Sequence, residues 1–154
     1  MKRLLISLGV VLFAACSAAS ADVVVDSAWV RAAPPGATML AGYATLRNSG
    51  SEAVSVIGID SNAFESVEMH RTEEVDGVSR MRPVAAIEIP PGGEAVLEPG
   101  GLHLMLIQPR QPLAEGDTVI LRLRLTDGRT VDAAFPVQRN AGEDPHAGHG
   151  HHHH

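Results

Sequence analysis

The stretch Thr118-Val119-Ile120-Leu121-Arg122-Leu123-Arg124-Leu125-Thr126 decides the fold of this chain. Its valine and leucines occupy every second position, and Arg122 and Arg124 stand between them. An alternation of period two is typical of an antiparallel strand with one face in the core and one in water. Asp127-Gly128 follows directly and is a hairpin signal, because glycine accepts the positive φ that such turns need. We therefore predict that 118–126 and 130–137 are consecutive strands of a hairpin.

Similar runs occur throughout the chain upstream of this hairpin. They are short and rich in valine, leucine, isoleucine and threonine, and glycine, proline, asparagine and aspartate separate them. No run keeps a helical apolar period over several turns. This pattern predicts one all-β domain, a sandwich or a barrel, over residues 22–139. The expected upstream strands are 23–25 continuing at 29–31, then 39–47, 54–59, 66–70, 87–89, 94–97 and 102–107.

The first 21 residues have the pattern of a secretory signal peptide. Lys2-Arg3 precedes an apolar run over 4–15, and Ala19-Ser20-Ala21 is a small-residue cleavage site. We expect a periplasmic or otherwise exported protein that begins at Asp22. A lipid anchor on Cys16, after Phe13-Ala14-Ala15, is the less favoured alternative, because Phe13 stands where leucine is usual.

The exported chain would carry no cysteine and a marked negative charge. Cys16 is the one cysteine of the sequence, so cleavage after Ala21 leaves neither a disulfide nor a thiolate ligand. Of the twelve basic residues, Lys2 and Arg3 leave with the signal peptide, and ten arginines then face eighteen acids for a net charge of −8. This balance argues against nucleic acid as a partner. We expect a monomer.

Two histidines and two methionines of the domain are predicted to share one face of the sheet. Six of the eight histidines lie from position 146 onward, which leaves His70 and His103 in the domain. The strand period puts His103 and Met105 on one face and the leucines between them on the other. A two-residue turn at Asp76-Gly77 would pair Thr72 with Met81 and so place Met81 diagonal to His70.

Imidazole and thioether groups together favour Cu(I). Hard cations such as Mg²⁺ and Ca²⁺ prefer oxygen ligands, and a blue-copper centre needs a cysteine. Two domain histidines are also few for a copper enzyme. The open alternative is that these are ordinary strand residues of a non-catalytic, exported scaffold or interaction domain with incidental metal binding. We expect Met39 and Met69 to lie in the core, where methionine commonly packs.

The spacing His70-x10-Met81-x21-His103-x-Met105 resembles the motif of the PCuAC (DUF461) periplasmic copper chaperones. Residues 29–36 and 43–48 are also similar to that family. The resemblance implies a cupredoxin-like Greek-key β-sandwich that is not an enzyme and binds one Cu(I) at a shallow surface site. It further implies delivery to the dinuclear copper site of cytochrome c oxidase subunit II, directly or through a Sco-type thioredoxin-like protein.

Residues 140–154 differ in composition from the domain and are predicted to be a disordered, His-rich tail. Its histidines are His146, His149, His151, His152, His153 and His154. They could be a purification tag, although glycines separate the first of them. We favour a native extension that binds Cu(II) or Zn(II), since His-rich tracts bind such ions.

Overall fold

The computed structural model describes residues 23–140, which form ten strands. The predicted signal peptide, Asp22 and the His-rich part of the tail lie outside these residues. The strands are β1 (Val23–Arg31), β2 (Met39–Asn48), β3 (Val54–Asp60), β4 (Phe64–Val75), β5 (Val78–Pro83), β6 (Ile87–Ile89), β7 (Glu94–Leu97), β8 (Leu102–Pro109), β9 (Thr118–Leu125) and β10 (Thr130–Gln138). The prediction of an all-β domain is confirmed. No helix among the described residues could cross a membrane.

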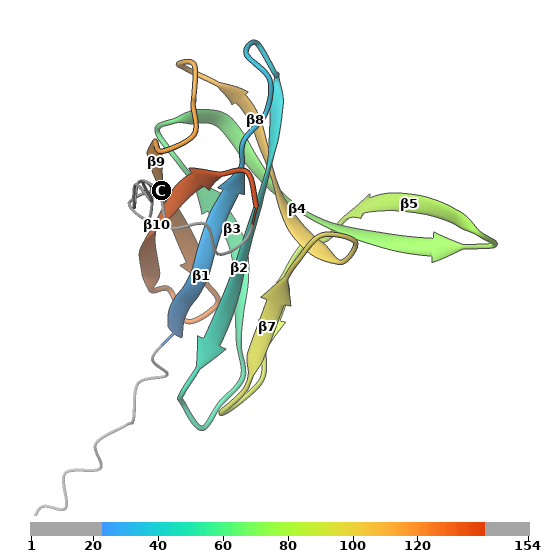
Figure 1. Cartoon of the computed structure of the whole chain (residues 1–154). Coiled ribbons are helices and arrows are strands. Elements are labelled where there is room, and N and C mark those ends of the chain that lie inside the picture. The colour runs from blue at the N-terminus through green and yellow to red at the C-terminus, as the bar shows by residue number, and fades with distance from the viewer. Residues whose placement is uncertain (1–22, 141–154) are drawn as a thin grey trace, which may run out of the picture.

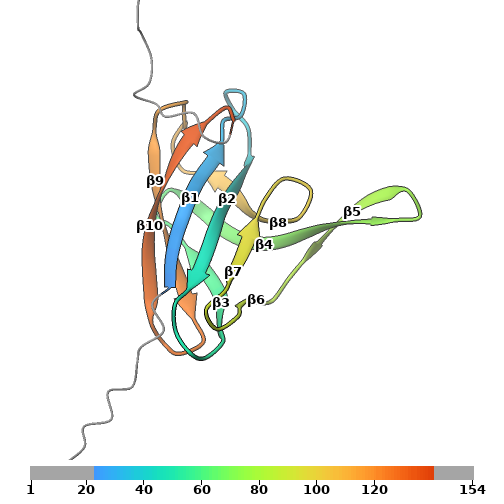
Figure 2. The ribbon, with the colours of Figure 1, turned by 60° about the horizontal axis from the view of Figure 1, so that its bottom comes forward.

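All ten strands belong to one sheet that closes on itself into a barrel-like body. Their order is β5-β4-β8-β7-β2-β1-β10-β9-β3-β6, with additional pairings of β4 with β3 and of β8 with β2. The pairing of β3 with β4 joins the two ends of the main row of strands. Figure 1 and Figure 2 show the resulting flattened barrel from two directions. The two layers of the predicted sandwich are therefore joined by hydrogen-bonded strands.

The core fills the inside of the barrel with residues from every second strand position. Strand β9 alternates exposed and buried residues along its whole length, as the sequence predicts. Full burial of each such apolar side chain contributes about 1.5–3 kcal/mol to folding, before the entropy cost is counted. The largest fully buried side chains are Phe64, Phe135, Leu46, Ile89, Leu104, Leu106, Leu121, Leu123, Leu125, Val30, Val56 and Val137.

Strands β4 and β5 form a hairpin arm that projects from the barrel. Figure 1 and Figure 2 show this arm leaving the body on one side. Its turn residues Asp76 and Gly77 both have positive φ, 53° and 76°, as a two-residue type I′ turn requires. Thr72 pairs with Met81 and His70 with Pro83, which confirms the predicted register. Every residue of β5 is exposed, so this strand adds nothing to the core.

Candidate metal centre

His70 and His103 lie directly opposite each other on adjacent strands at the base of the arm. Strands β4 and β8 pair antiparallel, and His70 is the register partner of His103. Opposite residues of an antiparallel pair point to the same face of the sheet. The two imidazole rings accordingly have centroids 6.0 Å apart, with an angle of 41° between their planes.

The hydrogen bonds of each imidazole fix which of its nitrogens carries the proton. His70 Nε2 lies 2.8 Å from a carboxylate oxygen of Glu68, and His103 Nδ1 lies 3.0 Å from the backbone carbonyl oxygen of Gly101. Both partners can only accept, so these two nitrogens are the donors of the neutral rings. The lone pairs then reside on His70 Nδ1 and His103 Nε2.

Those two remaining nitrogens are buried and have no hydrogen-bond partner. An unsatisfied buried polar atom costs about 1–3 kcal/mol, so two in facing residues need a reason. A metal-ligating histidine has this arrangement: one ring N–H is held by a carboxylate or carbonyl, and the other nitrogen is free for the ion. The donor set therefore fits a metal ion between the two strands.

Met105 and Met81 lie in the rows on either side of the histidine pair. Met105, two residues after His103, is the register partner of Glu68 and is half-buried. Met81 lies opposite Thr72, and its diagonal Cα separation from His70 is about 7–8 Å in such a ladder. Met81 is 52% exposed, so it does not fill the core. The register thus places all four predicted ligands on one face, although their role as ligands stays a prediction.

His103 is more deeply buried than a shallow surface site implies. Only 5% of it is exposed, although it lies on the outward face of the sheet. Farther along this face, the rings of Trp29 and Tyr43 have centroids 4.8 Å apart and are tilted by 39° to each other. The guanidinium of Arg31 lies over both rings, 5.7 and 5.4 Å from their centroids. This aromatic cluster belongs to β1 and β2, which lie on the side of β8 away from the arm.

The prediction that Met69 and Met39 both pack in the core is half right. Met69 is buried opposite Leu104. Met39, in contrast, is 53% exposed, so its assignment to the core is wrong. The reason is strand parity: Leu40, the next residue, faces inward, and a strand turns alternate side chains to opposite faces.

Sequence reasoning missed the second residue that holds each histidine. Glu68 and His70 are two positions apart in one strand, so their shared face could have indicated this contact. Nothing in the sequence points to the carbonyl of Gly101, because any residue supplies one. Over residues 23–140, no three His, Cys, Asp or Glu side chains come together in a way that would hold a metal ion. The tail histidines 146–154 lie outside the described residues.

Comparison with known proteins assigns the chain to a family. Residues 23–137 match the model of a family described as "Putative lipoprotein LpqE-like". The chain belongs to this LpqE-like family. "Putative lipoprotein Lxx21020" of Leifsonia xyli subsp. xyli is 36% identical over 119 residues, which cover 77% of this chain and 70% of that protein.

Solved structures of PCuAC domains share the fold of this LpqE-like chain. The Cu(I) form of DR1885 from Deinococcus radiodurans is 32% identical, with a TM-score of 0.63 over 82% of this chain and 84% of that one. The copper-bound PCuAC domain from PmoF2 is 23% identical, with a TM-score of 0.63 over 77% of this chain and 93% of that one, and supports the fold alone. The resemblance to the PCuAC family is confirmed.

Proposed function

We propose that this protein is an exported copper chaperone that binds Cu(I) as its cargo. His70 Nδ1 and His103 Nε2 supply nitrogen, and Met81 and Met105 supply sulfur. The observation that carries this proposal is the pair of buried imidazole nitrogens without partners on opposed residues of β4 and β8. The Cu(I) form of DR1885 supports the choice of metal.

The ligand chemistry suits a carrier that must also release its ion. Neutral imidazole and thioether bind without losing a proton at neutral pH, and both favour Cu(I) over hard cations. A site without thiolate cannot be lost to disulfide formation in an oxidising compartment. Release then proceeds by ligand exchange, in which the recipient's ligands replace these four one after another. No bond of a substrate is made or broken, so the protein is not an enzyme.

Competition for Cu(I) against a chromogenic chelator tests the site. Met81→Ala and His103→Ala should each weaken Cu(I) binding, whereas Val78→Ala should not, because Val78 is exposed on the same strand but points to the other face. X-ray absorption on the loaded protein should count both nitrogen and sulfur neighbours. Wild-type affinity in both ligand variants would reject this site, and absence of stoichiometric Cu(I) binding would leave an exported scaffold domain.

The recipient we propose is the dinuclear copper site of cytochrome c oxidase subunit II, reached directly or through a Sco-type thioredoxin-like protein. The PCuAC resemblance is the support for this step. Mixing the Cu(I)-loaded protein with the apo copper domain of subunit II, with and without the apo Sco-type protein, should transfer copper to subunit II. Copper that stays on the carrier in both mixtures would contradict this recipient.

Export follows from the predicted signal peptide at 1–21, and the family description adds weight to the lipid-anchored alternative. We keep cleavage after Ala21 as the proposal. The N-terminal sequence and mass of the mature protein decide between the two forms: Asp22 as first residue supports cleavage, and a lipid-modified Cys16 refutes it.

We also propose that the histidines of the tail bind Cu(II) separately from the Cu(I) site. The support is their density, since His-rich tracts bind such ions. Deleting residues 146–154 should lower the number of Cu(II) ions bound and leave Cu(I) affinity unchanged. An unchanged Cu(II) stoichiometry would refute the idea.

A further inference from the structure

The face of the sheet that carries His70, Met81, His103 and Met105 is here called the ligand face. Four consecutive rows of paired residues on it contain a histidine or a methionine, and the methionine of the fourth row is Met39. Strand β4 orders the rows: Thr72 lies opposite Met81, His70 opposite His103, Glu68 opposite Met105, and Ser66 opposite Ile107. On the other side of β8, Ala41 of β2 is the register partner of Met105, and Met39 is the partner of Ile107. Met39 therefore extends the row of Ile107.

The register fixes the direction in which Met39 points. Opposite residues of antiparallel strands share a face, so Met39 is on the face of Ile107, Met105 and His103. Its diagonal partner on β8 is Met105, at a Cα separation of about 7–8 Å. Methionine has three rotatable bonds and an unbranched side chain, so the two thioether groups can converge across the β2–β8 pair.

Packing gives no account of methionine at this position. The inward neighbour Leu40 is buried, whereas Met39 has about the same exposure as Met81 on the arm. A long apolar side chain that is half exposed at the first residue of β2 gains little from burial there. Half of Met39 is exposed to solvent, which distinguishes it from Met69, the methionine buried in the core.

We propose that Met39 is a third sulfur contact for Cu(I), shared with Met105, through which copper enters and leaves the histidine site. The proposal rests on the function proposed above and adds a route to it. Cu(I) would exchange one ligand at a time, from the imidazoles and Met105 to Met105 and Met39, and then to the recipient. The copper stays Cu(I) throughout, no electron is transferred, and no proton is released by a thioether.

Methionine-methyl NMR of the full chain tests the contact during titration with Cu(I). With ¹³C-labelled methionine methyl groups, the signals of Met81, Met105 and Met39 should move, and that of Met69 should not. In Met105→Leu the shift of Met39 should disappear, because the proposed contact is shared. An unmoved Met39 signal overturns the proposal. A shift that survives in Met105→Leu also overturns it, because Met39 would then contact Cu(I) without Met105, as an adventitious thioether.

The rate of copper release tests the route. Met39→Leu should raise the Cu(I) dissociation constant slightly, because one contact is lost, and should lose copper more slowly to an excess of a chromogenic chelator. Ile120→Leu, an equally exposed apolar residue on β9, should change neither quantity. Release at the wild-type rate from Met39→Leu overturns the proposed route. If Met81 and Met105 also fail to respond to Cu(I), the proposed function fails with it; if only Met39 fails, the function stands.

Discussion

At the scale of single residues, the two imidazoles that form the proposed binding site lower the free energy of unfolding of the copper-free protein. His103 contributes a buried nitrogen without a partner, an arrangement that costs about 1–3 kcal/mol. Its other nitrogen donates to the carbonyl of Gly101, but that oxygen also accepts the backbone N–H of Thr72 at 3.0 Å. Losing the imidazole would therefore leave no new unpaired group in the backbone.

His103→Leu is accordingly expected to keep or raise the stability of the copper-free protein, by about 1 kcal/mol, while removing Cu(I) binding. Urea unfolding followed by the fluorescence of Trp29, the one tryptophan of the chain, measures the first quantity. Leu104→Ala, at the inward-facing neighbour, should instead cost about 2–5 kcal/mol because it opens a cavity. A large loss of stability in His103→Leu would contradict the view that this residue serves binding rather than folding.

Glu68 is expected to act on copper through His70. Its carboxylate accepts from His70 Nε2 at 2.8 Å and so holds the ring with Nδ1 free for the ion. Removing a group that orients a metal-bound histidine typically lowers affinity about 10–100-fold. Glu68→Ala should weaken Cu(I) binding by an amount in this range, as measured by chelator competition. Glu73→Ala, on the opposite face of the same strand, is the matched control, and equal effects of the two changes would argue against the positioning role.

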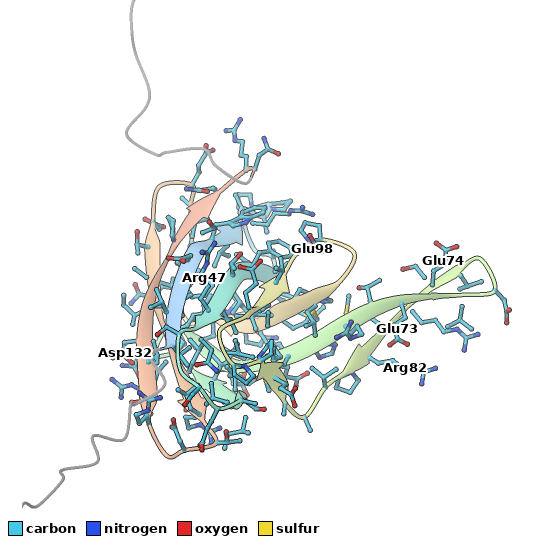
Figure 3. All side chains as sticks on the ribbon, turned by 90° about the horizontal axis from the view of Figure 1, so that it is seen from below. Arg47, Glu73, Glu74, Arg82, Glu98 and Asp132 are labelled. Atoms are coloured by element: carbon cyan, nitrogen blue, oxygen red, sulfur yellow. The ribbon has the colours of Figure 1, made fainter. Side chains whose placement is uncertain are left out.

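At the scale of elements, strand β5 contributes one predicted ligand, Met81, and only its register with β4 sets the direction of that side chain. Figure 3 shows Glu73, Glu74 and Arg82 on the arm, clear of the barrel. Because β5 is fully exposed, the core does not hold its register, and the turn at Asp76-Gly77 must do so. A shift by one residue would turn every side chain of β5 to the opposite face.

Inserting one glycine after Gly77 should therefore move Met81 off the ligand face and lower Cu(I) affinity as far as Met81→Ala does. Inserting two glycines restores the parity and should recover affinity. Thermal unfolding should be nearly unchanged in both insertions, because neither touches the barrel. Chelator competition and circular dichroism measure the two quantities, and similar affinities for the one- and two-residue insertions would show that Met81 is not a ligand.

The sequence predicts local pairing well and non-local pairing poorly. Asp76-Gly77 fixes its hairpin to the residue, so the pairing of Thr72 with Met81 could be predicted. No turn joins β4 to β8, and an alternating pattern is compatible with any shift of their pairing register by an even number of residues. The direct opposition of His70 and His103 therefore came only from the structure. The misplacement of Met39 was avoidable, since the parity of Leu40 predicts an outward side chain.

At the scale of the whole molecule, ion pairs across the barrel surface make stability depend on pH. Arg122 of β9 and Asp132 of β10 are register partners joined by two hydrogen bonds of 2.7 and 2.8 Å. The hydrogen bond from Arg122 lowers the pKa of Asp132 below its usual 3.8. A lowered pKa in the folded state adds stability that is present above the unfolded value and is lost as pH falls through the folded value.

Asp132→Asn should thus melt at a lower temperature than the wild type at neutral pH. The difference should shrink as pH falls below about 4, because the aspartate of the unfolded chain binds a proton there before the folded one, whose pKa is lower. High salt should also shrink it, because the pair is exposed and screened. Melting curves by circular dichroism between neutral pH and pH 3 measure the effect, and a constant difference across that range would contradict the assignment.

Copper binding should stabilise the entire barrel, because the histidine pair exists only when β4 and β8 are paired. An ion that binds the folded state alone adds about 2.7 kcal/mol when its free concentration is about a hundred times its Kd. Buffered Cu(I) should therefore raise the melting temperature of the wild type and have no such effect on His103→Leu. If the ligands instead come only from the exposed arm, which can unfold without the barrel, copper would leave the melting temperature of the barrel unchanged. The melting experiment thus distinguishes an ion held between two strands of the closed sheet from one held by the hairpin alone.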